Sequence, residues 1–227
     1  MNRSVLKNSN RIFNLKTAIF LGMAGIMGSV VLFAGDMLLY YNGSSTDFIS
    51  NMGNSSPERI IASGICALIA TWLYMLGAGQ IYYAFSPEKR WIRLTVFLTF
   101  SSIMIAYGIV HSEYIAIATS AKNGVETGLT PNALTGLAIA VNSILRKITY
   151  IPFGIFTILF IQSVWMKKTL YSRWIIFFSP VVFFFLMGPI VGILKGKWKV
   201  IVGGGYLNLI LLLFFTVTTI SLFKKKE

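Results

Sequence analysis

TAIFLGMAGIMGSVVLFAGDMLLYY, residues 17–41, is an apolar run of 25 residues in which Asp36 is the only charged side chain. A helix needs about 20 consecutive apolar residues to cross a bilayer, so this run predicts a transmembrane helix. The rest of the chain has the same character. Of its 227 residues 56% are hydrophobic and 12% are charged, about half the charged fraction of a typical soluble domain. The sequence therefore predicts an integral membrane protein built from α-helices.

Apolar runs of comparable length recur along the chain and predict six membrane spans in a single helical domain, residues 1–227. The spans are expected at 17–41, 60–85, 92–118, 148–166, 174–194 and 200–223. Before the second span, Ser56, Pro57 and Glu58 have the order typical of a helix start, with Ser56 as the N-cap. The predicted fold class is all-α, a polytopic transmembrane bundle.

Residues 131–147 precede the fourth span without a break in apolar periodicity. One helix from 131 to 165 would measure about 50 Å, well beyond a hydrocarbon core of about 30 Å. Its polar side chains, which include Asn142 and Arg146, recur at every turn and form one stripe. We therefore expect an interfacial or re-entrant helix on the outer side over 131–147. The alternative is a single long helix that projects outward.

The positions of Lys and Arg predict the orientation of the bundle. With both termini in the cytoplasm, the cytoplasmic segments hold 13 of the 20 basic residues, as the positive-inside rule requires. The net charge of +13 is spread over loop ends, which favours membrane lipids as partners and argues against nucleic acid. With one His, one Cys and no cofactor motif in the chain, we expect neither a metal site nor a cofactor.

Three acidic or imidazole side chains lie well inside predicted spans: Asp36 in the first, and His111 and Glu113 in the third. A charge in hydrocarbon is costly unless it is paired or hydrated, so such residues are candidates for a functional site. His111 and Glu113 lie about 200° apart around a helix and cannot face the same point. We predict an Asp36–His111 pair lined by Tyr107 and Tyr114, with Glu113 at the rim.

Other polar residues are expected at the same depth, in the outer half of the bundle. Arg59 begins the second span and is placed to act as a counter-ion for Asp36. Asn142 should join the site from the polar stripe of 131–147. Glu58 and Arg146 are expected at the rim.

Four short motifs in the first 120 residues carry a resemblance to known proteins. They are GDMLLYY at 35–41, SPER at 56–59, LGAGQIYY at 76–83, and AYG at 106–108 followed by His111. Together they resemble a family of uncharacterised bacterial multi-pass membrane proteins. The resemblance implies a bacterial cytoplasmic membrane and marks Asp36, Glu58, Arg59 and His111, but it implies no activity.

Three classes of function fit these observations. The first is a protein that binds or processes a lipid-like or small amphipathic ligand, in which a His–carboxylate pair transfers a proton. The second is a small, proton-coupled transporter, which a continuous polar path from Asp36 to Gln80 would favour. The third is a non-catalytic scaffold or accessory subunit, which a bundle without a cavity would favour. The sequence leaves enzymatic activity and oligomeric state open.

Overall fold

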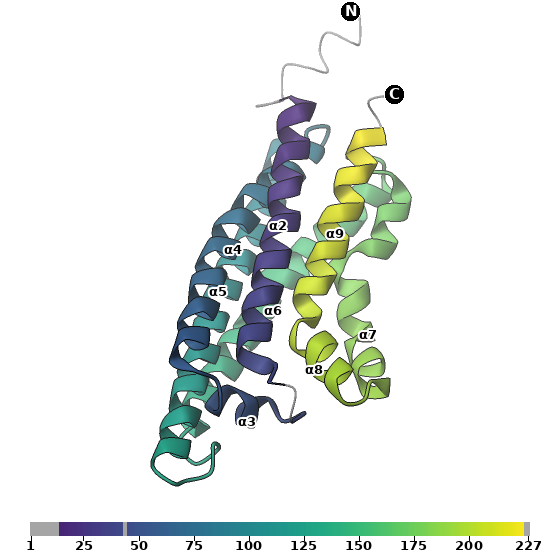
Figure 1. Ribbon diagram of the computed structural model, residues 1–227. Coiled ribbons are helices and arrows are strands. Elements are labelled where there is room, and N and C mark those ends of the chain that lie inside the picture. The colour runs from purple at the N-terminus through teal and green to yellow at the C-terminus, as the bar shows by residue number, and fades with distance from the viewer. Residues whose placement is uncertain (1–13, 43–44, 225–227) are drawn as a thin grey trace, which may run out of the picture.

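The computed structural model describes residues 14–42 and 45–224, which form helices joined by turns, with no strand among them (Figure 1). The helices are α2 (Leu15–Tyr40), α3 (Phe48–Gly53), α4 (Pro57–Ala84), α5 (Arg90–Glu126), α6 (Gly136–Trp165), the 3-10 helix η1 (Arg173–Phe178), α7 (Pro180–Ile193), α8 (Lys197–Gly204) and α9 (Tyr206–Phe223). The predicted all-helical class is confirmed. Several predicted cytoplasmic residues, Arg3, Lys7, Arg11, Lys225 and Lys226, lie outside the described residues.

Five of these helices, α2, α4, α5, α6 and α9, are long and apolar enough to cross a membrane. The predicted span at 174–194 is the exception, because it divides into η1 and α7. Pro180 favours an extended conformation in the residue before it, and Ser179 indeed has φ −62° and ψ 140°. The 14 residues of α7 extend about 21 Å, less than the thickness of a hydrocarbon core.

The structure also corrects the separate interfacial helix expected over 131–147. Residues 131–134 form a turn, and residues 136–147 are the first turns of α6, a continuous helix of 30 residues. No proline interrupts 136–147, and Pro152 is accommodated within the helix. The alternative of one long helix is therefore the correct one. The preceding helix, α5, likewise extends beyond its predicted end at 118 and reaches Glu126.

Small residues allow α2 and α4 to pack closely along their length. A Cβ added to Gly77 of α4 would lie 2.9 Å from the Cα of Gly25 in α2. Phe215 of α9 packs into the space that these two glycines leave, since a Cβ on either would lie within 2.8 Å of its ring. This is the close approach that small residues permit between transmembrane helices.

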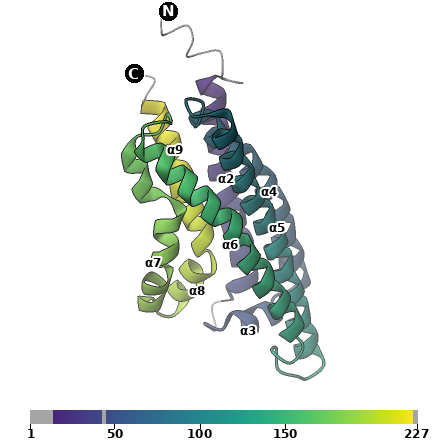
Figure 2. The ribbon, with the colours of Figure 1, turned by 180° about the vertical axis from the view of Figure 1, so that it is seen from behind.

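The other helices are arranged around this pair (Figures 1 and 2). α5 packs on α4, and α9 packs on α2. α6 crosses obliquely from α5 to η1, while α7 and α8 lie against α9 (Figure 2). The start of α2 and the end of α9 lie at the same end of the bundle, and the site described below lies toward the opposite end (Figure 1).

Candidate functional site

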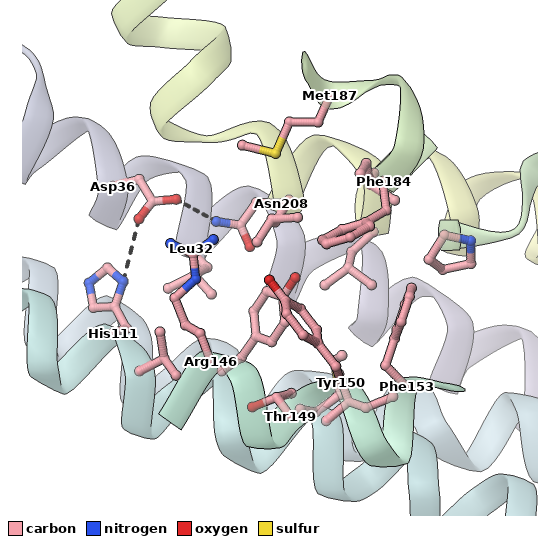
Figure 3. Close-up of a pocket in the computed structure, with 18 of the residues that line it drawn as sticks. Leu32, Asp36, His111, Arg146, Thr149, Tyr150, Phe153, Phe184, Met187 and Asn208 are labelled. Atoms are coloured by element: carbon pink, nitrogen blue, oxygen red, sulfur yellow. Dashed lines mark hydrogen bonds and ion pairs between the residues drawn. The ribbon is translucent and has the colours of Figure 1, made fainter. Parts of the chain in front are cut away.

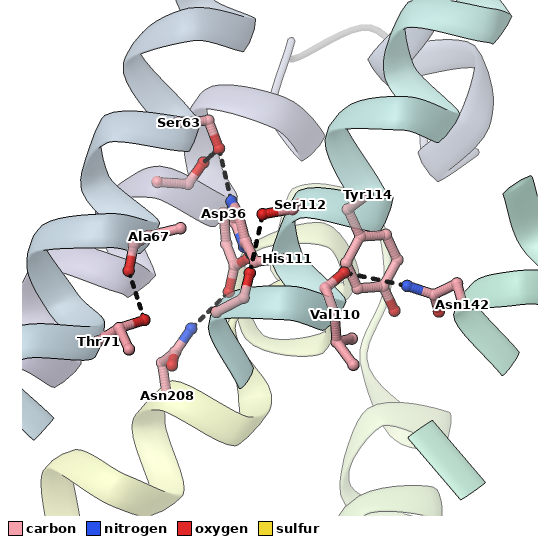
Figure 4. A network of polar contacts seen from close by, with 12 residues as sticks. Asp36, Ser63, Ala67, Thr71, Val110, His111, Ser112, Tyr114, Asn142 and Asn208 are labelled. Atoms are coloured by element: carbon pink, nitrogen blue, oxygen red, sulfur yellow. Dashed lines mark hydrogen bonds and ion pairs between the residues drawn. The ribbon is translucent and has the colours of Figure 1, made fainter. Parts of the chain in front are cut away.

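Asp36 and His111 are in contact, so α2 and α5 are joined by a buried polar pair. His111 Nδ1 lies 3.4 Å from Asp36 Oδ1, and the residues are only 5% and 6% exposed. Asn208 of α9 donates from Nδ2 to the other carboxylate oxygen, Oδ2, at 2.6 Å. Tyr74 of α4 in turn donates to Asn208 Oδ1 at 3.0 Å. Four helices therefore meet at this network, part of which is shown in Figure 4.

Both ring nitrogens of His111 have a polar partner, Asp36 at Nδ1 and Ser63 at Nε2. Ser63 Oγ is 2.8 Å from the carbonyl oxygen of Gly35 and 2.8 Å from His111 Nε2. A carbonyl can only accept, so Ser63 donates to Gly35 and turns its oxygen toward Nε2. The other ring nitrogen, Nδ1, faces Asp36, so the imidazole is held between α4 and α2.

Ser63, His111 and Asp36 have the order of a Ser–His–Asp triad, but the geometry does not make Ser63 a nucleophile. A nucleophile needs a base that takes its proton and space for a reacting carbon. The Ser63 hydroxyl donates to Gly35 instead, is fully buried, and does not line a cavity. Its role is to hold His111 by one ring nitrogen, which leaves the other nitrogen for Asp36.

A cavity of about 180 Å³ lies beside the pair (Figure 3). Its polar lining includes Asp36, His111, Asn208 and Arg146. The rest of its lining is mainly apolar and aromatic and includes Phe100, Phe153, Phe156, Phe184, Met187 and Leu211. The cavity therefore has polar groups and a hydrocarbon-like surface within one space, which is the usual composition of a small-molecule site.

A second cavity, of about 520 Å³, adjoins the first. The two share lining residues, among them Tyr40, Tyr114, Arg146 and Tyr150. Asn142, Ser143 and Lys147 of α6 line only the second cavity. Arg146 thus lies at the junction, and its Nη1 donates to Tyr114 Oη at 3.2 Å.

The structure brings several predicted residues to these cavities. Tyr107 lines the first cavity, Tyr114 lines both, and Asn142 lines the second while donating to the carbonyl of Val110 at 3.1 Å. Arg146, which was expected only at the rim, reaches the centre of the site because α6 is continuous through this region. The polar stripe predicted for 131–147 therefore faces the interior of the bundle.

Arg59, Glu58 and Glu113 are not brought to the pair. Arg59 donates through Nη2 to the carbonyls of Met37, at 3.1 Å, and Tyr41, so it satisfies the carboxyl end of α2 and is no counter-ion for Asp36. Glu58 is exposed at the start of α4. Glu113 is half-buried, lines neither cavity and forms no ion pair with a described residue.

Sequence reasoning missed Asn208 and Ser63, although each contacts the central pair. Both lie in apolar helices, and an amide in such a helix is itself a signal because it needs a hydrogen-bond partner there. Asn208 carries that signal, whereas Ser63 does not, since serine commonly bonds to its own helix. Within residues 14–42 and 45–224, no group of three or more His, Cys, Asp or Glu residues could hold a metal ion.

One comparison with known proteins gives a result. The model of a family of unknown function, DUF6796, matches residues 8–225. The comparisons with curated proteins and with solved structures gave no significant match. The geometry of the site is therefore the basis for any functional statement.

Proposed function

This chain belongs to that family of unknown function, and we propose that it binds a lipid-like, amphipathic molecule in the two adjoining cavities. The observation that carries the proposal is the lining of the first cavity. Asp36, His111 and Asn208 form its polar part, and a cluster of phenylalanines forms much of the remainder. A ligand with a polar head and a hydrocarbon chain satisfies both parts, whereas water or a purely apolar molecule satisfies only one.

The arrangement of the helices supports entry of the ligand from the membrane. Unlike α5, α6 packs on few other helices, and α7 lies mainly against α9 rather than against α6. Phe184 and Met187 of α7 and Thr149 and Phe153 of α6 nevertheless line the same cavity (Figure 3). The first cavity thus lies between two helices that are joined there by contacts of the Phe184 ring with Tyr150 and Phe153, and a lipid-like molecule can pass if these rings move.

We place the protein in a bacterial cytoplasmic membrane with both termini in the cytoplasm. The excess of Lys and Arg in the predicted cytoplasmic segments supports this orientation. The start of α2 and the end of α9 lie at one end of the bundle, as this orientation requires (Figure 1). The cavities then lie in the outer half of the membrane. The Asp36–His111 pair can give a proton to, or accept one from, a ligand bound there.

A cavity-filling variant tests this proposal. Thr149 lines the first cavity, whereas its neighbour Ile148 is 57% exposed on the outside of α6. With decyl maltoside or decyl phosphate as the probe, we expect Thr149→Trp to weaken binding by tenfold or more, since the indole occupies the ligand's space. Ile148→Trp is the matched control and should bind like the unmodified protein. Equal binding by both variants, or no binding of any amphiphile, would contradict the proposal.

A proton-coupled carrier is the second candidate function, although the buried polar contacts that would serve it form two separate groups. Polar contacts run from His111 through Asp36 and Asn208 to Tyr74. A separate buried group lies further toward the termini, where Gln80 donates to Thr219 at 2.9 Å and accepts from Thr218. Phe215 separates the two groups, because its ring stacks on Tyr74 and fills the space beside Gly77.

The path from Asp36 to Gln80 is therefore interrupted at one side chain. If the protein carries protons, Phe215→Ala should raise proton flux into vesicles severalfold, as measured with a pH-sensitive dye. Phe223→Ala, at an exposed position of the same helix, is the control. Unchanged flux in Phe215→Ala would remove this candidate and leave ligand binding unaffected.

A further inference from the structure

Arg146 is a charged residue that has no counter-ion among residues 14–42 and 45–224. It is half-buried, it lines both cavities, and no carboxylate among the described residues is in ion-pair contact with it. A guanidinium has five N–H donors, and the structure gives it one hydrogen bond, to Tyr114. A charge withdrawn from water in this way is costly unless an anion accompanies it.

The part of the chain that the structure describes does not supply that anion. Asp36 lines the same cavity, but one of its oxygens faces His111 and the other accepts from Asn208. Both Asp36 oxygens therefore have partners of their own, and Asp36 forms no ion pair with Arg146. Lys147, which follows Arg146 and lines the second cavity, adds a second positive charge.

Hydroxyl groups complete the surroundings of Arg146. Tyr114 Oη accepts from Arg146, so its own hydrogen remains available to donate to a further acceptor. Tyr40, Tyr107, Tyr150 and Thr149 line the first cavity with it. Figure 3 shows Arg146 extending from α6 into the cavity between the His111–Asp36 pair and Tyr150. Such a site provides a guanidinium and O–H donors, which are the groups that bind carboxylate and phosphate oxygens.

We infer that the ligand of these cavities is an amphiphile with an anionic head group, a phosphate or a carboxylate, bound by Arg146 with its hydrocarbon chain in the aromatic part of the first cavity. This inference rests on the proposed function. A cavity of about 150 Å³ accommodates benzene, so the first cavity, of about 180 Å³, takes the end of one hydrocarbon chain rather than a whole lipid. The second cavity, of about 520 Å³, has room for the head group.

Binding measurements on the purified full-length protein test the head group. The probes are decyl phosphate, decanoate, decyl maltoside and decyltrimethylammonium, which share a ten-carbon chain. We expect decyl phosphate or decanoate to bind about 10- to 100-fold more tightly than decyl maltoside, as for a charge-assisted hydrogen bond. The cationic probe should bind most weakly. Equal affinity for the anionic and neutral probes would overturn the inference but leave the proposed function, which is tested separately by the Thr149→Trp variant and by whether any amphiphile binds.

Variants at Arg146 assign the preference to that residue. Arg146→Gln should remove the preference for anionic probes while decyl maltoside still binds, and Arg146→Lys should retain part of it. Lys168→Gln is the matched control, since Lys168 is exposed beyond the end of α6 and lines neither cavity, and it should change anion affinity by no more than about threefold. A preference that persists in a folded Arg146→Gln protein would overturn the assignment.

Inorganic phosphate distinguishes a lipid head group from a free anion. If the aromatic part of the cavity contributes as inferred, millimolar phosphate will not displace decyl phosphate. If inorganic phosphate displaced decyl phosphate and bound as tightly as decyl phosphate does, the site would be one for a free anion. That result would overturn the inference of a lipid-like ligand.

Discussion

His111 Nδ1 lies 3.4 Å from Asp36 Oδ1, while His111 Nε2 lies 2.8 Å from Ser63 Oγ. Asp36 and His111 are 75 residues apart in the sequence and come from helices α2 and α5. Because each is the partner of the other in a buried site, their contributions to stability and binding should depend on one another.

A double-mutant cycle measures this dependence. Removal of either partner leaves the other buried and unpaired, so Asp36→Leu and His111→Leu should each destabilise the protein by about 1–3 kcal/mol. The double variant should lose less stability than the sum of the losses in the two single variants, with a coupling energy of about 1–2 kcal/mol. Denaturant or thermal unfolding in detergent gives these values. Ser112→Ala, at an exposed neighbour of His111, is the control. Additive effects would show that the contact contributes nothing.

Asn208 should contribute more to stability than its partner Tyr74. Asn208→Leu removes the bonds that an Asp36 oxygen and the Tyr74 hydroxyl make to the amide, which we expect to cost about 2–3 kcal/mol. Tyr74→Phe removes one hydroxyl and should cost about 1 kcal/mol. The difference is read from the unfolding midpoints of the two variants. An equal loss in both would mean that the bond from Asn208 to Asp36 is energetically unimportant.

Ser63 should not react as a nucleophile. A fluorophosphonate probe labels serines that a neighbouring base activates, but the Ser63 hydroxyl is buried and donates to Gly35. We expect no label at Ser63 by mass spectrometry, in native protein or with a bound amphiphile. We also expect Ser63→Ala to weaken the Asp36–His111 coupling measured above. Stoichiometric labelling of Ser63 would require a hydrolytic function instead.

The contact between Gly25 and Gly77 predicts opposite effects for two glycine substitutions. A methyl group on Gly77 would lie 2.9 Å from Gly25 Cα, so Gly77→Ala should destabilise by about 1–3 kcal/mol. A Cβ on Gly154 in α6 meets no atom within 4 Å, so Gly154→Ala should be neutral or stabilising by up to about 1 kcal/mol. Thermal unfolding distinguishes them. If Gly154→Ala destabilised the protein and Gly77→Ala did not, the result would contradict the packing of α2 on α4.

Predictions from the sequence were best where a property depends on neighbouring residues along the chain. The start of α4 is an example, because Ser56 caps the helix and Pro57 occupies its first turn as expected. The predicted ends of α5 and α6 were less accurate, since apolar periodicity along a helix does not indicate where the membrane surface lies. The division of 174–194 follows from a local feature, Pro180, which disfavours a helical conformation at Ser179.

The sequence by itself determined the helical class, the apolar spans and the rarity of ionisable groups within them, since these depend on composition and on periodicity along one helix. Only the tertiary structure decided which polar groups meet. Asn208 and Ser63 join Asp36 and His111 because α4 and α9 pack against α2 and α5, and Arg146 reaches the cavities because α6 continues through the region expected to break. These contacts depend on the rotation and register of one helix against another. Side-chain packing across the whole bundle determines both, so they cannot be predicted from the sequence of any single segment.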